Sequence, residues 1–563
     1  MTRYQLSEPI PTESQALFLG IDPLIAQLLW NRNVRTRADV DTFLSPNFAA
    51  RHDPFLMTDM EKAVERILAA MKAGERIAIW SDYDCDGIPG AVLFHDFFSA
   101  VGYTNFENYI PHRHDEGFGL SKEGIDTLIA RDTTLIVTLD CGIAHVAEVA
   151  HAMKKGVEVI VTDHHEPGEI LPPAYAILDP KRDDAYPFKE LCGSGVAWKL
   201  IEGLLARGGF TLALGQEKWW LDMVGLATMA DMVSLTGENR ILAHYGMMVM
   251  RKSKRKGFHA LCRALDLDQR MIADDDIGFS IAPRVNAASR MGHPRDAFDL
   301  FTATTDETAR ERAMHLEKIN SERKGVVASI VKEIKKRLVM RVGEQVIVIG
   351  NPEWRPSLLG LAANSLAEEY KRPAFVWGRD GRGIIKGSCR SGGTSSVVAL
   401  MQRAAESFIE YGGHHASGGF SVHEEKIHSL NEQLNAAYDS FGHEPVVETS
   451  LPLDADLTLD QVTDALYRNI SALSPFGVGN EKPRFRFLGI TPERVTAFGK
   501  ATDHTKLTFA KKFGSIEAIA FFKTPERFTE KLLAGKPIDL IAHVEKATFR
   551  GRTSLRLRIV DIL

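Results

Sequence analysis

Acidic residues and histidines follow three short apolar runs in the first third of the chain. RIAIWS, LIVTL and VEVIVT are followed closely by Asp82, Asp84, Asp86, by Asp140, and by Asp163, His164 and His165. Carboxyl ends of parallel strands open on one edge of a sheet, so these groups are expected to lie together. Gathered carboxylates repel one another unless cations lie between them. Carboxylate and imidazole donors without thiolates favour Mn²⁺ or Mg²⁺ over structural zinc.

Each cluster taken alone has a simpler explanation. An aspartate at a strand end often caps a helix or forms an Asx turn. DYDCDG also begins like a calcium loop, but Leu93 stands at the twelfth position, where a bidentate glutamate is required. The metal interpretation rests on three clusters in register with three predicted strands. Two divalent ions at such a site would favour hydrolysis of a phosphoester or phosphoanhydride.

The elements that must position these residues alternate between apolar runs and helical patterns. This alternation predicts an α/β fold with a parallel sheet covered on both faces. Residues 305–341 carry apolar residues at spacings of three and four and predict one long helix. Period-two strands near the C-terminus predict a small β-barrel. Its arginines are candidates for contacts with a nucleic-acid backbone: Arg550, Arg552, Arg556 and Arg558.

Length and composition limit the classes of protein that the chain can be. Its 563 residues, 44% hydrophobic and 25% charged, indicate a folded protein of about three to four domains. A formal net charge of −6 argues against coating of nucleic acid through bulk positive charge, although local charge can still bind a strand. The five scattered cysteines include no CxxC pair. With no signal peptide or membrane-spanning run in the sequence, we expect a cytoplasmic protein without membrane contact.

Several motifs resemble a known superfamily. DYDCDG, LDCGI and TDHH occur in the order found in the DHH phosphoesterase superfamily. YIPHRHDEGFGL, GLATMADMVSLTGENR and YGGHHASGG are further similar to the RecJ family of bacterial single-strand-specific exonucleases. The resemblance implies a metal-dependent enzyme that degrades single-stranded DNA from the 5′ end to mononucleotides, in DNA repair and recombination. It also implies a monomer whose protein partners are a single-strand-binding protein and a helicase.

The sequence patterns and the resemblance together divide the chain into five segments, three of which are principal domains. They are an N-terminal helical lead at 1–60, a DHH catalytic domain at 61–304, a connecting helix at 305–341, a smaller α/β DHH-associated domain for substrate binding at 342–445, and an OB-like nucleic-acid-binding barrel at 446–563.

The resemblance also assigns roles to residues. Two Mn²⁺ or Mg²⁺ ions would be held by Asp82, Asp84, Asp140, His164 and Asp231. His165 would face the scissile phosphate, and Asp163 would support the neighbouring histidines. Substrate phosphates would be bound by Arg113, Arg284, Asn286, Arg290, Ser388, Arg390, Gly413 and His414. Guanidinium groups and glycine-rich loops suit phosphate oxygens, although each arginine could instead pair with a nearby acid and each glycine could form a turn.

Some residues differ from those usual in the family. They are Pro89, His112, Ser289 and the run Arg355-Pro356-Ser357. These differences concern substrate contacts, whereas the implied metal ligands are intact.

Two other functions remain alternatives. One is a DHH phosphodiesterase for cyclic dinucleotides or short oligoribonucleotides, which the C-terminal barrel and the APRVNAASRMG segment disfavour. The other is a non-catalytic DHH scaffold in a replication complex, which the intact ligand set disfavours.

Overall fold

The computed structural model divides the chain into two compact units. It describes residues 4–339, 344–393, 395–440, 450–499, 502–528, 532–549 and 552–563. The larger unit holds His52–Val233 and Tyr245–Val447, and the smaller holds Met1–Arg51, Ser234–His244 and Glu448–Leu563.

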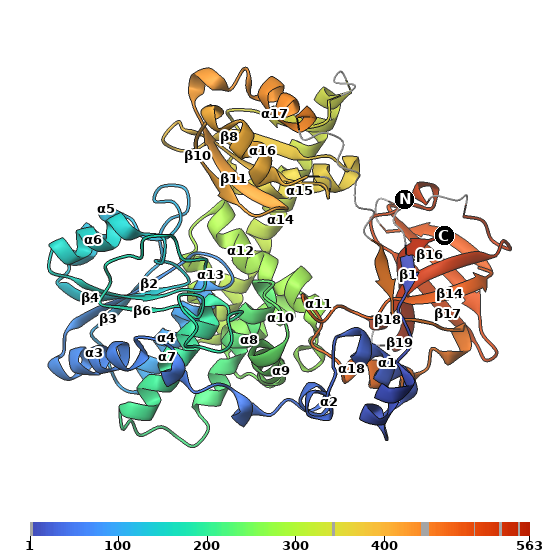
Figure 1. Cartoon of the computed structure of the whole chain (residues 1–563), viewed down its shortest axis with the longest axis horizontal. Coiled ribbons are helices and arrows are strands. Elements are labelled where there is room, and N and C mark those ends of the chain that lie inside the picture. Colours follow the sequence, from blue (N-terminus) through green and yellow to red (C-terminus); the bar gives the residue numbers. More distant parts are fainter. Residues whose placement is uncertain are drawn as a thin grey trace. The chain divides into compact units, whose positions relative to one another are not determined.

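A five-stranded parallel sheet lies at the centre of the larger unit's first lobe. Its order is β3 (Phe106–Tyr109), β2 (Arg76–Ser81), β4 (Thr133–Leu139), β5 (Glu158–Thr162) and β6 (Ala176–Leu178). The helices α3 (Met60–Ala73), α4 (Gly87–Ala100) and α7 (Gly193–Arg207) cover one face, and α5 (Lys122–Ile129) and α6 (Val146–Lys154) cover the other (Figure 1). Because both faces are covered, the strands are continuous apolar runs rather than alternating ones. The short edge strands β3 and β6 flank the three strands expected from the sequence.

A long helix joins this lobe to a second one. The helix α14 (Asp306–Leu338) begins at Thr305, whose side chain accepts a hydrogen bond from the Thr308 N–H. Its first part packs against α10 (Lys256–Ala264), α12 (Ala282–Met291) and α13 (Arg295–Phe301). Further along, Ile330 and Ile334 enter a core shared with α15 (Pro356–Tyr370). One helix therefore contributes to the cores of both lobes.

The second lobe is a smaller α/β layer. Its sheet runs in the order β10 (Phe408–Gly413), β11 (Ser417–Val422), β9 (Ile385–Arg390), β8 (Ala374–Arg379) and β7 (Ile347–Gly350). Only the β7–β8 pair is parallel within this sheet. The helices α15, α16 (Val397–Arg403) and α17 (Leu430–Asp439) pack on it.

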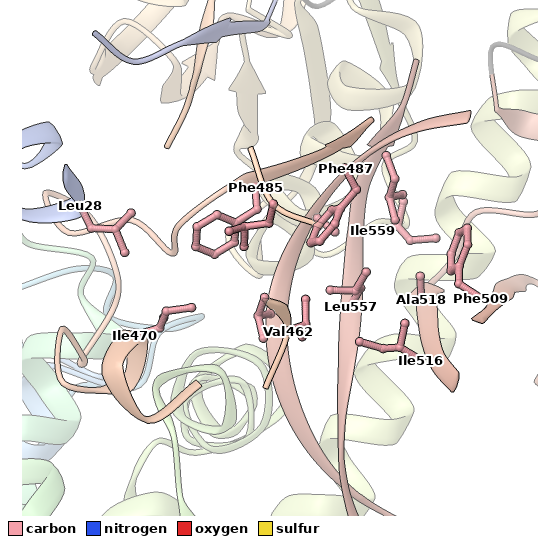
Figure 2. Packing of buried hydrophobic residues seen from close by; sticks show 14 of the residues in the cluster. Leu28, Val462, Ile470, Phe485, Phe487, Phe509, Ile516, Ala518, Leu557 and Ile559 are labelled. Carbon is pink, nitrogen blue, oxygen red and sulfur yellow. The ribbon is translucent and has the colours of Figure 1, made fainter. Parts of the chain in front are cut away.

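The smaller unit is built on a seven-stranded sheet. Its order is β13 (Ala455–Asp456), β14 (Phe485–Ile490), β18 (Ile538–Phe549), β19 (Arg552–Ile562), β17 (Ser515–Ala520), β16 (His504–Ala510) and β15 (Arg494–Phe498). Its core contains Phe485, Phe487 and Leu557 (Figure 2). Leu28 of α1 (Pro23–Asn31) lies in the same core. The N-terminal helices therefore belong structurally to the C-terminal sheet.

The basic candidates of the last strand are only partly described. Arg550 lies outside the described residues, and the side chain of Arg552 is not described. The guanidinium groups of Arg556 and Arg558 lie 5.6 and 4.2 Å from the centre of the Phe521 ring. Charge and an aromatic face therefore occur together on this sheet, as in surfaces that bind single strands.

Among the described residues, the structure shows neither a disulfide nor a helix that could span a membrane. All five cysteines lie in described segments, are buried and form no disulfide. Within the described part of the chain, none of the helices has both the length and the apolar character needed to cross a bilayer.

Candidate metal centre

Three parallel strands bring their acidic residues to one edge of the sheet. The backbone N–H of Asp82 donates to Leu139 O at 3.1 Å, that of Asp140 to Thr162 O at 3.0 Å, and that of Asp163 to Leu178 O at 3.0 Å. Each aspartate thus stands one residue beyond its strand and pairs with the neighbouring chain. The register of the sheet places the three carboxylates side by side.

Acidic and imidazole groups converge at this edge. Three overlapping groups have ligand atoms within 4.8 Å of one another: Asp82, Asp84 and Asp140; Asp86, His164 and Asp231; and Asp140, His164 and His165. Nε2 of His164 lies 3.2 Å from Oδ1 of Asp140 and 3.7 Å from Oδ2 of Asp231. Asp231 arrives from the C-terminal end of α8 (Leu221–Ala230), far from the other ligands in sequence. The structure therefore gathers all five proposed ligands.

The cluster is electrostatically unfavourable without cations. Burial, followed by the charge of Asp84, raises the pKa of Asp82 well above its usual value. Burial and Asp86 raise the pKa of Asp140 in the same way, and burial with Asp86 and Asp84 raises the pKa of Asp231 to about 9. Burial lowers the pKa of His164. Burial and mutual repulsion thus favour the neutral form of these acids, and burial favours the neutral form of the His164 imidazole.

The donor set fits a divalent cation. Oδ1 of Asp82 is buried and accepts no hydrogen bond from the described residues. Oδ1 of Asp140 also has no well-aligned donor among them, although it lies near His164. Buried carboxylate oxygens without partners are costly, and a cation would satisfy them. Oxygen donors with one or two imidazoles match Mn²⁺ or Mg²⁺. The residues present therefore fit the metal predicted from the sequence.

Two glycines let the backbone close around these acids. A Cβ on Gly87 would lie 2.3 Å from the carbonyl oxygen of Asp82, and a Cβ on Gly193 would lie 2.5 Å from Cβ of Asp140. Asp140 itself has φ +61°, a left-handed conformation that is uncommon for residues other than glycine. Strained backbone of this kind is concentrated at functional sites.

Asp86 holds the two helices that border the centre. Its carboxylate accepts hydrogen bonds from the N–H groups of Gly193 at 2.6 Å and Ser194 at 2.7 Å, at the start of α7. Asp86 is also the residue that precedes α4. Since both of its oxygens serve this purpose, Asp86 orients the ligands around it, and the DYDCDG motif alone did not reveal that role.

His165 and Asp163 form a pair at the border of the cluster. Nδ1 of His165 lies 2.7 Å from Oδ1 of Asp163, which also accepts the His164 N–H at 2.8 Å. Burial alone would lower the pKa of His165, but the hydrogen bond to Asp163 raises it to about 9. The His165 side chain is 48% exposed, so a charged imidazole lies half-exposed at the border of the cluster.

An aromatic group lies beside this histidine. The ring of Phe118, 47% exposed, lies edge-on to His165 at 5.8 Å and to Tyr83 at 6.3 Å. The guanidinium of Arg113 lies 4.7 Å from the centre of the Tyr83 ring. The structure thus brings Arg113 to the border of the metal cluster.

The three predicted residues of α12 have different surroundings. Asn286 accepts the Cys85 N–H at 2.9 Å and so holds the DYDCDG loop. Arg284 donates from Nε to Glu317 at 2.8 Å, which is the acid pairing that the sequence left open. Burial, with the charges of Arg113 and Arg323, lowers the pKa of Arg290 to about 10. Arg290 also donates to Ser357 O at 2.7 Å. Ser357, which differs from the residue usual in the family, therefore contacts an arginine that is proposed to bind a substrate phosphate.

The predicted residues of the second lobe lie on neighbouring strands. Ser388 and Arg390 belong to β9, and Arg390 is the register partner of Ser417 on β11. Gly413 ends β10 with φ +140°, and a Cβ there would lie 2.3 Å from Ser417 O, so the tight β10–β11 turn requires glycine. His414 follows it, is exposed, and donates its N–H to Ser417 O at 2.8 Å. The sheet therefore places this turn at the end of β9 that carries Arg390.

One buried acid near the centre was not found from the sequence. Asp179 follows β6, and burial raises its pKa to about 7, with a further contribution from Asp163. The apolar run AIL before it is only three residues long, which is too short to predict a strand with certainty. The pattern of an acid directly after an apolar run was nevertheless present and could have indicated Asp179.

Known families match three parts of the chain. The DHH family N-terminal domain matches residues 76–228, the DHHA1 domain residues 335–439, and the RecJ OB domain residues 453–561. The single-stranded-DNA-specific exonuclease RecJ of Bacillus subtilis is 31% identical over 570 residues, covering 99% of this chain and 70% of the relative. This chain belongs to the RecJ family. RecJ of Escherichia coli is 30% identical, with 84% of each chain covered.

Solved RecJ structures agree with the fold. RecJ of Thermus thermophilus in complex with Mn²⁺ superposes with a TM-score of 0.83 at 25% identity, covering all of this chain and 79% of that one. A manganese-bound exonuclease RecJ superposes with a TM-score of 0.59 at 28% identity, covering 70% of this chain and 98% of that one. The predicted family and α/β fold class with a C-terminal OB domain are confirmed. Manganese-bound RecJ relatives, together with the grouped acids and histidines, also support the cofactor prediction.

Proposed function

We propose that this RecJ-family chain is a metal-dependent exonuclease that degrades single-stranded DNA from its 5′ end to mononucleotides, in DNA repair and recombination. The observation that carries the proposal is the convergence of Asp82, Asp84, Asp140, His164 and Asp231, in a chain similar over almost its whole length to single-stranded-DNA-specific exonucleases. The 5′ polarity rests on the resemblance of the sequence motifs.

These five residues would hold two divalent ions. When bound, the ions stabilise charge on the phosphoryl oxygens and increase the acidity of the attacking water. Asp86, Gly87 and Gly193 keep the ligand carboxylates close together. The charged His165, oriented by Asp163, is placed to donate a hydrogen bond to the scissile phosphate.

Binding of the strand would use cations beside the metal cluster. Arg113 is close enough to its border for its charge to act on the pKa values of Asp82 and Tyr83, and the charge of Arg290 acts on the pKa of Tyr83. Ser388 and Arg390 would bind a phosphate of the strand from the second lobe. Arg284 and Asn286 act chiefly as positioning residues in this proposal, because each already holds a protein partner.

The cellular location, oligomeric state and partners of the enzyme are inferred from the same family. We infer a cytoplasmic monomer that acts on single-stranded DNA, with a single-strand-binding protein and a helicase as partners. The OB domain would supply a second surface for the strand through Arg558 and Phe521, whereas Arg556 pairs with Glu545 at 3.1 Å.

An end-labelling experiment tests the proposed function. Single-stranded DNA labelled at the 5′ or the 3′ end is incubated with the full chain and Mn²⁺, with Asp140→Asn as the inactive control. Early release of labelled mononucleotide from the 5′ label alone is expected. Persistent full-length substrate, or early release of mononucleotide from the 3′ label, would contradict the proposal. Faster cleavage of a dinucleotide in direct competition would favour a DHH phosphodiesterase.

A further inference from the structure

A basic groove runs along the connecting helix, in the same unit as the metal centre. It has a volume of about 910 Å³ and lies between α14 and α15. Its lining on α14 recurs every four residues, which makes it one continuous face of the helix. The lining residues are Arg323, Lys324, Val327, Ala328, Val331, Lys332, Lys335, Lys336 and Val339, with Leu361 and Ser365 from α15.

The charged residues that line the groove are cationic. Five of its lining side chains are cationic, and none of the described lining residues is acidic. Glu369 of α15 pairs with Lys335 at 2.6 Å, but Lys332 and Lys336 project as exposed side chains. Between these cations lie Val327, Val331 and Leu361, which form an apolar floor. A cationic rim above an apolar floor is complementary to a flexible strand with charged phosphates and apolar base faces.

One end of the groove adjoins the proposed phosphate ligands. Burial and the neighbouring charge of Arg284 lower the pKa of Arg323, and Arg323 in turn lowers the pKa of Arg290. Burial and Arg284 also lower the pKa of Lys324. Arg290 donates to Ser357 O at 2.7 Å, and Ser357 lies one turn before Leu361 on α15, so a series of cations leads from Arg290 into the groove. From Arg323 to Lys336 it extends about 20 Å at about 1.5 Å per residue.

We propose that this groove binds the substrate strand beyond the nucleotides held at the metal centre. Phosphates contact Lys324, Lys332 and Lys336, and bases lie on Val327, Val331 and Leu361. The inference rests on the proposed function, because it takes single-stranded DNA as the occupant. It adds a strand-binding subsite on the connecting helix, which makes catalytic efficiency depend on substrate length.

Charge reversal in the groove tests this inference. Lys332→Glu/Lys336→Glu removes two proposed phosphate contacts, and neither residue belongs to the metal centre. Arg310→Glu/Lys318→Glu is the matched control, since both residues are exposed on α14 outside the groove lining. The ratio kcat/KM is measured for a strand of about 30 nucleotides and for a dinucleotide, at several salt concentrations.

The groove variant is expected to lose at least about tenfold in kcat/KM on the long strand and little on the dinucleotide. The dependence of log kcat/KM on log salt should become shallower by about 1.4, the value for two lost phosphate contacts. A strand carrying 4-thiothymidine should crosslink to residues 323–339 of the wild type.

Failure of the proposed function and failure of the groove inference give different results. If the wild type degrades no strand, the proposed function fails. If the wild type is active but the groove variant behaves like the control on both substrates, the groove does not bind the strand and the inference is overturned.

Discussion

At the scale of single residues, Asp140 joins a ligand carboxylate to a left-handed backbone. Its φ of +61° turns the chain sharply after β4, and its carboxylate meets ligand atoms of both Asp82 and His164. Gly193 leaves room for this turn. Asparagine also accepts the left-handed region, whereas alanine does so at a cost of about 1–2 kcal/mol.

Asp140→Asn should separate metal binding from folding. The amide keeps the shape and the backbone conformation but removes a buried charge among like charges, so the metal-free variant should unfold at or above the wild-type temperature. Turnover should fall by more than the roughly 10–100-fold typical of residues that only support a metal ligand. Thermal unfolding with chelator, paired with the end-labelling assay, measures both effects.

The stabilisation lost on metal removal is a second test of Asp140 as a metal ligand. Mn²⁺ at about 100 times its Kd should stabilise the wild type by about 2.7 kcal/mol relative to chelator, because the ion binds the folded site. Asp140→Asn should show much less stabilisation. An equal gain in both proteins would mean that Asp140 is not a ligand.

At the scale of elements, the centre depends on strand ends meeting helix starts. The loop after β2 leads into α4, and the loop after β4 lies against the first residues of α7. Asp86 connects these two helix starts through its hydrogen bonds to Gly193 and Ser194. The positive ends of the helix dipoles lie near the anionic ligands and so also reduce the mutual repulsion of the carboxylates. The distances between ligands are therefore set by how closely the elements approach.

Gly193→Ala tests this close approach. The added methyl would overlap Asp140, so the loop or α7 must move, with a loss of about 1–3 kcal/mol in the free energy of unfolding. Because the ligand moves, kcat should fall by more than about tenfold. Gly278→Ala is the control, since a Cβ at that position would have nothing within 4 Å and activity should be unchanged. Wild-type kcat in Gly193→Ala would show that the ligand spacing tolerates displacement of α7.

At the scale of the whole molecule, the two ends of the chain build one unit. Leu28 and Leu29 of α1 are fully buried in the core that contains Phe485 and Leu557. The strand β1 (Tyr4–Leu6) pairs with β12 (Leu451–Leu453) in parallel. The smaller unit therefore requires the N-terminal segment for a complete hydrophobic core.

Leu28→Ala should destabilise the smaller unit. Loss of a fully buried leucine side chain costs about 2–5 kcal/mol in the free energy of unfolding. Leu19→Ala, in the same segment but 74% exposed, should have little effect. Hydrogen exchange of amides in β14 and β18 reads out the effect locally. Equal protection in both variants would mean that α1 contributes little to this core.

The sequence by itself determined the α/β pattern, the connecting helix and the acids at three strand ends. These features follow from local periodicity and from residues adjacent in the chain, and residues 305–341 became α14 (Asp306–Leu338) for that reason. The family motifs added Asp231, which strand ends could not indicate because it follows a helix.

Only the tertiary structure decided which groups share a site. It joined Asp86 to α7, paired Arg284 with Glu317, gave Arg290 its contact with Ser357, and placed α1 in the core of the C-terminal sheet. Each of these contacts joins residues that are distant in the chain. Their free energy comes from burial and hydrogen bonding that exist only once the elements have packed, so local patterns carry no record of them.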